Sequence, residues 1–586
     1  MESMRRAALA TILCAAPLMA APAHVLAAPA DRLGLRELLR QEARAAGAGA
    51  IALPLPEPPR ASSAASRREL AGIARSHRPE RVLVGVRDHG ELAGVAAALR
   101  RLGADQEPLA TIAVLAARVP SGAALVAALG SDPRVAYIER DRELRAAADP
   151  FDTIDPSTGI KFTWAFDEVR AGEALAAAGG GSARTVAVID TGLDASHPEF
   201  AGRVARSFDT RSGGAAVTDS VGHGTFVSGL IAAVDGNGIG GKGVGGTTKI
   251  VVVDAEQACD DGTRGCFTVG DLVRGIEFSI RSGADVLNMS LAGEGFSRSH
   301  ARALEAAFFN DVLPVAASGN NAQRAHDPNP LEFPAAAIGG RRGDRGIGLS
   351  VAATNPFGGV AGFSNHNDFV SLAAPGAGPG GCQFGVFSTL PANRLTEWDV
   401  PGSCSRVFAD PSGARFAYGE GTSFAAAVAS GIAALTWQVE ARLASEQVAE
   451  VLTESARQTV GSGWNEFTGS GIVDGQAAAA LARSYDVSAP RARASARRRP
   501  QNQVAVRLRR SPDRTEPGRA LAGRVTYGLL VSRDGGRDFN VLVSRRRRPF
   551  SIAVRLRGRR PNVLVATACD ANGNCGVKRL GRFRAR

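Results

Sequence analysis

The sequence predicts an α/β protein: a central region built on a parallel sheet, with a small α+β module before it and a small β-sandwich domain after it. Three observations indicate this order. Apolar runs separated by Ala-rich helical stretches fill the middle of the chain, strands and helices alternate over a short span before it, and period-two alternation follows it. The length of 586 residues also favours several domains over one.

Composition and charge narrow the class of protein. With 45% hydrophobic residues and few aromatic ones, the chain is neither wholly disordered nor a polytopic membrane protein. The net charge of +12 is unevenly placed: residues 491–586 carry 26 Arg and Lys against 5 Asp and Glu, a net of +21, so residues 1–490 carry −9. The basic character therefore belongs to the C-terminal part of the chain.

Residues 1–28 predict a secretory signal peptide. Arg5 and Arg6 precede an apolar Ala/Leu/Ile run, which ends in the small residues that signal peptidase prefers. A membrane anchor is the alternative, but Pro17 and Pro22 interrupt the run and leave it short of the roughly 20 apolar residues that a spanning helix needs. We therefore expect a secreted or cell-surface protein with no transmembrane segment.

The next part of the chain divides into a linker and a small folded module. Residues 29–78 are rich in Ala, Arg, Pro and Ser, which is typical of a linker-like pro-region. Residues 79–147 instead alternate between strand and helix patterns. The order strand, helix, strand, helix, strand predicts an α+β module, with elements at 82–86, 91–102, 111–119, 122–129 and 135–138.

Residues 148–486 predict the central α/β domain. Its strands read as continuous apolar runs, as expected for a parallel sheet covered on both faces by helices. The strand candidates lie at 186–189, 250–253, 286–289, 312–316 and 349–353. Because ligands of such sheets bind at the carboxyl ends of strands, we expect the chemistry to follow these segments.

Three segments of the central domain place a reactive side chain where a strand ends or a helix begins. Asp190 directly follows the first strand, His223 has a glycine on each side, and Ser423 opens an Ala-rich helix. Alone, each has an ordinary interpretation as a turn, loop or helix-capping residue. Together, in the order Asp, His, Ser, they supply an orienting acid, a base and an attacking hydroxyl, the set that nucleophilic acyl transfer needs.

These three segments, in this order, resemble the subtilisin (subtilase) family of serine endopeptidases, and the likeness extends over residues 164–476. The resemblance implies a subtilisin-like fold and an acyl-enzyme mechanism that needs no catalytic cofactor. It also implies roles for the three side chains. Asp190 is the expected orienting acid, His223 the general base and Ser423 the nucleophile.

Two further segments, 285–292 and 315–320, are similar to the substrate-lining strand and the oxyanion segment of that family. The resemblance implies that the Asn320 side chain and the Ser423 backbone N–H hold the oxyanion. The substrate-binding residues that it implies are Ser290, Leu291, Ala292, Ala317, Ser318 and Gly319. The primary pocket that they are expected to wall shows no buried acid, which favours a broad preference for apolar side chains there.

The sequence departs from the family pattern at three positions. Phe424 stands where Met is usual, Ala427 where Pro is usual, and Phe226 where His is common. None is a catalytic group, so we expect altered packing at the start of the helix rather than loss of activity. A non-catalytic binding protein on the same scaffold is the alternative, and the complete set of catalytic candidates argues against it.

An aspartic protease is a second alternative, because Asp190 begins an Asp-Thr-Gly triplet. That mechanism needs two carboxylates that share a proton. No second Asp-Thr-Gly or Asp-Ser-Gly follows a comparable strand in the sequence, which disfavours this mechanism.

The resemblance also implies a propeptide and a calcium site. Residues 79–147 resemble the family's inhibitory propeptide, which implies a zymogen that processes itself, with the new N-terminus between residues 142 and 162. Structural calcium is implied at Glu199, the Asn237 side chain and the carbonyls of Ile239 and Gly241, which are hard oxygen ligands. The alternative is a flexible Gly-rich turn beside a surface glutamate.

The cysteines predict disulfides. Six remain after the signal peptide, in three close pairs: Cys259/Cys266, Cys382/Cys404 and Cys569/Cys575. An even number in an exported chain favours disulfides, and pairing of neighbours is the simplest connectivity. Zinc is the alternative, but no histidine lies at ligand spacing. We expect the first bridge to stiffen the rim of the substrate cleft, and Asp260 and Asp261 inside it to favour basic substrate residues.

Residues 487–586 predict a basic, β-rich domain that weakly resembles immunoglobulin-like or fibronectin type III modules. Its strands alternate apolar residues with arginines, and turns are expected at 534–536 and 572–573. The charge favours an anionic cell-envelope polymer as partner. Nucleic acid is disfavoured by the export signal and the scarcity of aromatic residues for stacking. A solvated charged face without a partner is the other alternative.

Overall fold

The structure is a computed structural model of the chain. It describes residues 70–87, 91–109, 114–140, 151, 153–259, 264–323, 328–379, 384–392, 406–459, 462–511, 525–533, 540–558 and 560–585. The chain forms two compact units, one of residues 48–146 and one of residues 1–47 and 147–586. Each unit is described by itself. The signal peptide expected at 1–28 and most of the linker expected at 29–78 lie outside the described residues.

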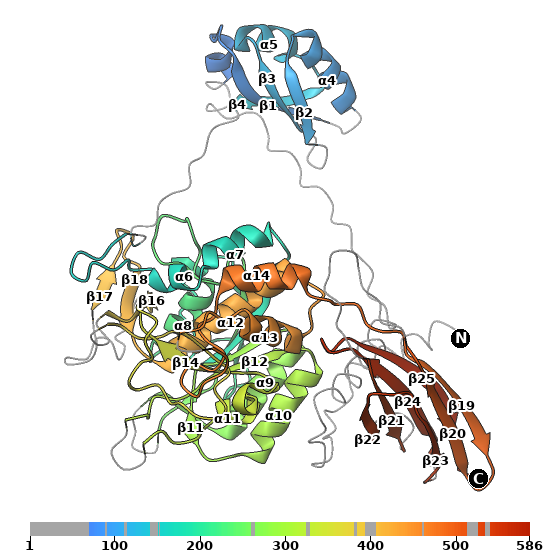
Figure 1. The fold of residues 1–586 in the computed structure, drawn as a ribbon. Helices are drawn as coiled ribbons and strands as arrows, with labels where there is room; N and C mark the ends of the chain where they lie inside the picture. The colour runs from blue at the N-terminus through green and yellow to red at the C-terminus, as the bar shows by residue number, and fades with distance from the viewer. Residues whose placement is uncertain are drawn as a thin grey trace. The chain divides into compact units, whose positions relative to one another are not determined.

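The described part of the first unit is a four-stranded antiparallel sheet with two helices and a short helical segment at residues 70–74 (Figure 1). The elements are β1 (Glu80–Val86), α4 (Leu92–Arg101), β2 (Asp105–Leu109), β3 (Val114–Val119), α5 (Gly122–Leu129) and β4 (Val135–Arg140). The sheet order is β2-β3-β1-β4. The expected elements are present, and β2 is an additional edge strand. Its sequence, DQEPL, is polar and contains a proline, so it lacks the apolar pattern of a strand.

The centre of the second unit is a seven-stranded parallel sheet of order β15-β14-β12-β10-β5-β7-β6 (Figure 1). Its strands are β5 (Thr185–Asp190), β6 (Val204–Asp209), β7 (Lys249–Asp254), β10 (Val286–Met289), β12 (Leu313–Ala317), β14 (Leu349–Thr354) and β15 (Leu372–Pro375). The predicted parallel α/β fold is therefore confirmed, with β6 and β15 added at the two edges.

Helices cover both faces of this sheet. They are α6 (Trp164–Glu168), α7 (Ala171–Ala178), α8 (His223–Ala232), α9 (Val269–Arg281), α10 (Arg298–Phe309), α11 (Ala335–Ile338), α12 (Thr422–Val439), α13 (Ser445–Glu454) and α14 (Gly475–Ser484). Alternate residues of β5 enter two different cores: Val186 and Val188 pack with α8 and α12, while Ala187 and Ile189 pack with α9 and α10. This two-sided burial explains the continuous apolar runs in the sequence.

The helix α12 lies at the middle of the central domain. Among the described residues it is the one helix long and apolar enough to cross a membrane, and 89% of that stretch is buried inside the protein. Its apolar character is accounted for by this burial in the core.

Three small antiparallel sheets complete the domain. One consists of β16 (Val386–Leu390), β17 (Val407–Ala409) and β18 (Arg415–Gly419), and it packs an aromatic cluster. The others pair β8 (Glu256–Gln257) with β9 (Cys266–Phe267), and β11 (Gly293–Glu294) with β13 (Glu332–Phe333).

The C-terminal strands form two antiparallel sheets (Figure 1). One contains β19 (Arg493–Arg499), β20 (Gln503–Arg509) and β23 (Ser551–Arg555); the other contains β21 (Thr526–Ser532), β22 (Asn540–Arg546), β24 (Asn562–Cys569) and β25 (Cys575–Phe583). Val504 and Val506 of the first sheet and Leu529 and Leu564 of the second belong to one core, so the two sheets form the predicted sandwich. The turn expected at 534–536 lies outside the described residues.

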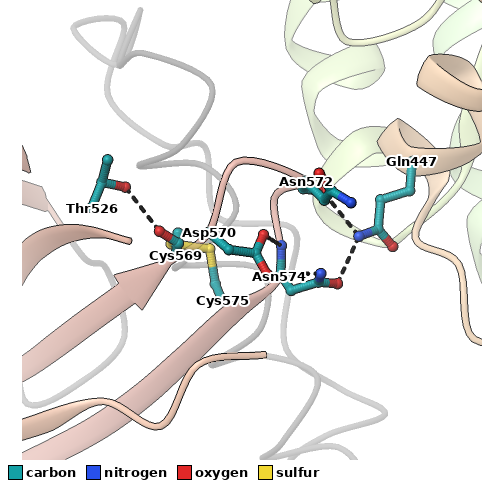
Figure 2. Close-up of a disulfide and its surroundings, with 7 residues drawn as sticks. All are labelled: Gln447, Thr526, Cys569, Asp570, Asn572, Asn574 and Cys575. Atoms are coloured by element: carbon teal, nitrogen blue, oxygen red, sulfur yellow. Dashed lines mark hydrogen bonds between the residues drawn. A yellow bond between two sulfur atoms is a disulfide. The ribbon is translucent and has the colours of Figure 1, made fainter. Parts of the chain in front are cut away.

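Two of the expected disulfides are present, Cys259–Cys266 and Cys569–Cys575. Cys382 and Cys404 lie outside the described residues. Figure 2 shows the second bridge at the β24–β25 hairpin, whose tip contacts α13. The Gln447 amide there donates to the Asn572 carbonyl (3.0 Å) and to Asn574 Oδ1 (2.7 Å). These bonds and the bridge fix the hairpin on both sides.

Candidate active site

Asp190 is placed by the strand β5. The β-branched sequence of this strand runs to the carboxyl edge of the sheet and leaves Asp190 as its last residue, with none of its surface exposed. The Thr191 N–H donates to Asp190 Oδ1 over 2.8 Å. A carboxylate buried in this way needs donors, and the next one comes from a different segment.

That donor is His223, the first residue of α8. Gly222 precedes it with φ of 100°, and a side chain at Gly224 would lie 2.2 Å from the Gly192 carbonyl, so glycines are required on both sides. The His223 Nδ1 lies 2.7 Å from Asp190 Oδ1. Because a carboxylate only accepts hydrogen bonds, Nδ1 carries the proton and Nε2 is left as the basic nitrogen.

Asp219 joins the two loops that carry Asp190 and His223, and the sequence analysis missed it. Its buried carboxylate accepts hydrogen bonds from Thr191 Oγ1 (2.9 Å), Gly222 N (2.7 Å) and Thr225 N (2.7 Å). Burial raises the pKa of this carboxyl, and the hydrogen bonds oppose that rise. The available signal was an acid four residues before His223 in a Gly-containing loop.

Ser423 lies in the first turn of α12, as expected. Its hydroxyl donates to the Ser290 carbonyl (2.9 Å), and the Ser290 hydroxyl donates back to the Ser423 carbonyl (2.6 Å). The two expected site segments are therefore joined directly. The next residue is Phe424. The centroid of its ring lies 5.5 Å from that of the His223 ring and 4.3 Å from that of the Phe226 ring. Two of the departures from the family pattern thus contact each other.

Asn320 follows β12, and its side-chain amide is oriented by Thr422. The Asn320 Oδ1 accepts from the Thr422 N–H (2.9 Å) and the Thr422 hydroxyl (2.8 Å). The Gly319 N–H in turn donates to the Thr422 hydroxyl over 3.2 Å. With Oδ1 held by two donors, Nδ2 points the other way and is the donor that the site can offer to an oxyanion.

The expected substrate-binding residues lie in two segments that follow adjacent strands of the sheet. Strands β10 and β12 are parallel neighbours with Met289 opposite Ala316, and the two segments follow directly from them. Ser290, Ala317, Ser318 and Gly319 are buried, Leu291 is half-buried and Ala292 is exposed.

A buried acid, Glu332, lies beside Gly319, one of the residues expected to wall the primary pocket. A side chain at Gly319 would meet Glu332 Oε2 at 1.7 Å. No local pattern indicated this contact, because Glu332 belongs to a different segment, the short strand β13. Asn321 and Asn365 donate to its two oxygens over 2.9 and 2.7 Å.

The structure also brings together the residues proposed for calcium. The Glu199 carboxylate is buried, the Asn237 amide donates to its Oε2 (3.0 Å), and the Ile239 N–H donates to Asn237 Oδ1 (3.0 Å). A side chain at Gly241 would lie 3.5 Å from Glu199 Oε1. Among the described residues, no group of three or more His, Cys, Asp and Glu side chains is arranged to hold a metal.

The cleft-rim insert is linked to the loop that precedes His223. Arg264 donates to the Ser220 hydroxyl and to the buried Glu256 carboxylate, each over 2.8 Å. The Cys259–Cys266 bridge closes the same insert. The residues 260–263, which include both expected acids, lie outside the described part of the chain.

Comparison with known proteins agrees with this geometry. Residues 181–471 match the model of the Subtilase family. The chain is similar to fervidolysin of Fervidobacterium pennivorans, with 32% identity over 53% of this chain and 42% of fervidolysin. It is also similar to the thermophilic serine proteinase of Bacillus sp. (strain AK1), with 28% identity over 56% of this chain and 71% of that protein.

A third similar protein is the M-protease of Shouchella clausii (strain KSM-K16), with 29% identity over 60% of this chain and 76% of that protein. The chain thus spans less than half of fervidolysin and about three quarters of the other two. The parallel sheet, the Asp190–His223 pair and Ser423 at the start of α12 all lie within the matched residues. The chain belongs to the subtilase family, a family of serine proteases that hydrolyse peptide bonds.

Proposed function

We propose that the protein is a secreted serine endopeptidase, made as a zymogen, with Asp190, His223 and Ser423 as its catalytic triad. The observation that carries this proposal is the 2.7 Å hydrogen bond between His223 and Asp190, at the same sheet edge from which Ser290 contacts Ser423. The geometry supports one basic nitrogen, one nucleophilic hydroxyl and a set of amide donors beside it.

In this mechanism each group has one task. His223 Nε2 takes the Ser423 proton as Oγ attacks the substrate carbonyl, and later gives that proton to the leaving amine. Asp190 holds the ring and stabilises its positive charge. The Asn320 Nδ2 and the Ser423 N–H, at the positive end of α12, stabilise the oxyanion. Water then hydrolyses the acyl-enzyme.

Comparison of the wild type with Ser423→Ala tests the assignment. We expect the wild type to hydrolyse casein and to release its N-terminal segment by a cut that leaves a first residue between 142 and 162, and the variant to do neither. Ser430→Ala is the control, since Ser430 lies in the same helix and donates to Asn288 in the core. A Ser423→Ala protein that processes itself and cleaves casein at the wild-type rate would exclude Ser423 as the nucleophile.

We also propose that residues 1–28 direct export and that residues 79–147 act as the inhibitory propeptide. Support comes from the signal-like N-terminus and from the separate compact unit of residues 48–146. Such a unit can be cut away without opening the core of the rest. N-terminal sequencing of the exported protein tests both points: a first residue between 142 and 162 is expected, and a product that retains residues 79–147 while fully active would contradict the proposal.

A structural calcium ion is proposed at Glu199, Asn237, Ile239 and Gly241. The support is that the buried Glu199 carboxylate, the Asn237 side chain and the glycine-lined loop lie together, and that these residues carry the carboxylate, amide and carbonyl oxygens that calcium prefers. Arg203 is the competing charge, because it interacts electrostatically with Glu199, and burial lowers the pKa of Arg203. Calorimetric titration with calcium should give binding that Glu199→Gln abolishes and Arg203→Gln strengthens; binding unchanged in both variants would place the ion elsewhere.

The C-terminal domain, residues 487–586, is proposed to retain the protease at anionic polymers of the cell envelope. The support is its net charge of +21 over residues 491–586, in a chain whose remainder is acidic. High salt should release the protein from cells. Release that is the same after deletion of residues 487–586 would contradict retention by this domain.

A further inference from the structure

One face of the C-terminal sandwich is covered by arginines. In β19, β20 and β23 the apolar residues point into the core, and the residues between them are exposed. The strand registers place the exposed arginines on the same side of the sheet. This arginine face consists of Arg493, Arg497, Arg499, Arg507, Arg509 and Arg555.

The arginine face is costly for the fold by itself. Arg493 lies directly opposite Arg509 in the antiparallel register, and like charges in such pairs are destabilising. The sequences of the three strands, RASARRR, QVAVRLR and SIAVR, contain no acidic residue that offsets the repulsion. A solvated strand face needs only polar residues, so folding and solubility do not account for six arginines on one side of one sheet.

We propose that the arginine face is the surface that binds an extended anionic polymer of the cell envelope; this deepens, and rests on, the retention proposed above. Neighbouring strands lie about 4.8 Å apart and alternate residues of a strand about 6.6 Å apart. The six arginines therefore occupy positions on a two-dimensional grid with these steps, so an extended chain of phosphates or carboxylates can contact several of them at once. Arginine suits this task because it binds such groups with two parallel hydrogen bonds.

The test distinguishes binding by the arginine face from attraction by the net charge of the domain. The full chain carrying Ser423→Ala is compared with two versions of it that each lose six arginines by Arg→Gln. The first version changes the arginine face. The second changes six exposed arginines elsewhere in the same domain: Arg491, Arg547, Arg548, Arg560, Arg582 and Arg584. Binding to polyphosphate of fixed length is measured over a range of salt concentrations, with single-stranded DNA as a second probe.

Replacing the six arginines of the face should weaken polyphosphate binding by more than tenfold relative to the charge-matched control. It should also lower the number of ions released on binding, measured from the salt dependence of the affinity, by up to about six. Equal weakening in both versions would contradict the arginine face as the binding surface, without contradicting retention by the domain. Absence of polyphosphate binding by the parent chain would overturn both proposals. Tighter binding to single-stranded DNA than to polyphosphate would overturn the choice of an envelope polymer.

A second and independent observation concerns Asn365, which forms hydrogen bonds with residues on both sides of Asn320. Asn365 is fully buried. Its Oδ1 accepts from Asn321 N (2.8 Å), its backbone N–H donates to the Gly319 carbonyl (2.9 Å), and its carbonyl accepts from Ser318 Oγ (3.2 Å). These three bonds fix both sides of Asn320, which itself is exposed.

Asn365 is fixed in turn by Glu332. The Asn365 Nδ2 donates to Glu332 Oε2 (2.7 Å) and to the Pro330 carbonyl (3.1 Å), and the Asn321 side chain donates to Glu332 Oε1 (2.9 Å). From this network we infer that Asn365 and Glu332 are positioning residues, which hold the Asn320 amide where the oxyanion forms.

An exchange of donor and acceptor tests this inference. In Asn365→Asp an oxygen replaces Nδ2 and faces Glu332 Oε2, so two carboxylates repel unless they share a proton. Adding Glu332→Gln supplies a new donor to the introduced carboxylate while keeping an acceptor for Asn321. We expect Asn365→Asp to lower kcat by 10- to 100-fold with little change in KM, and the double variant to recover most of the loss. Asn355→Asp, in a turn where Oδ1 accepts two backbone N–H groups, is the control.

Two readouts distinguish positioning from a general structural role. The activity of Asn365→Asp relative to the wild type should rise as the pH falls, since a shared proton removes the repulsion. In an Asn320→Ala background the Asn365→Asp substitution should lower kcat by less than threefold, because its effect acts through Asn320. A loss in that background as large as in the wild type, or a double variant as impaired as Asn365→Asp alone, would contradict the inference.

Discussion

The Thr422 hydroxyl offers the sharpest test of how the oxyanion donor is oriented. Thr422→Val removes this hydroxyl and nearly preserves the volume of a side chain that has no exposed surface. The Asn320 Oδ1 then keeps one donor of two, and the buried Gly319 N–H loses its acceptor. A neutral hydrogen bond of this kind contributes about 0.5–1.5 kcal/mol.

The expected effect on catalysis follows from these bonds. Loosening the Asn320 amide should raise the barrier by about 1–2 kcal/mol, a decrease in kcat of roughly 5- to 30-fold at unchanged KM. The upper limit is the loss of the whole donor, about 2.7–4 kcal/mol, a value that comes from subtilisin itself. The unpaired Gly319 N–H should in addition lower the free energy of unfolding by about 1–3 kcal/mol.

Steady-state hydrolysis of a chromogenic peptide, normalised by active-site titration, measures the catalytic part. Thr422→Ser retains the hydroxyl and should keep kcat within about threefold of the wild type. The double variant with Asn320→Ala should be hardly slower than Asn320→Ala alone, since both substitutions affect one interaction. A Thr422→Val enzyme with the wild-type kcat, or additive losses in the double variant, would refute this account of the site.

Three further predictions concern the surroundings of the site. Those that are measured by unfolding use the Ser423→Ala background. Burial raises the pKa of Asp254 to about 7. Between about pH 4 and 7 its carboxyl is therefore neutral in the folded protein and charged in the unfolded chain. The free energy of unfolding falls as the pH rises through that range. Asp254→Asn should match the wild-type Tm only below about pH 4 and exceed it by a growing margin as the pH rises to 8; an equal difference at pH 4 and pH 8 would contradict this. Arg264→Gln frees the rim insert from Ser220 and Glu256 and should lower kcat/KM several-fold, whereas Arg281→Gln, at an exposed helical pair, should not. Chelation of calcium should lower the Tm of the wild type and leave that of Glu199→Gln unchanged; equal decreases would place the relevant ion elsewhere.

Much of the fold was predictable because burial on both faces leaves a clear pattern. All five predicted central strands are strands of the seven-stranded sheet. The missed strands have physical reasons. β6 lies at the sheet edge with mostly exposed or half-buried residues, and β15 has four residues and ends in a proline.

Candidate site residues could be proposed from the sequence only where a side chain stands next to a clear strand or helix boundary. Asp190 is the last residue of β5, and His223 and Ser423 lie in the first turns of α8 and α12. Asp219, Glu332 and Asn365 lack such a boundary signal, and each has at least one partner that is 28 to 47 residues away in the sequence. Contacts of this kind depend on the fold and leave no local signal.

Ser423, the proposed nucleophile, belongs to a helix that is buried in the core of the domain. This helix contacts the strands β10, β12, β14 and β15 and the helices α7, α8, α13 and α14. Because these contacts surround the helix, we expect its backbone to open only together with the core and Ser423 to keep its place during local fluctuations. The enzyme should therefore not pass through a folded but inactive form on heating, and the rate at which it is lost should be set by the barrier to global unfolding.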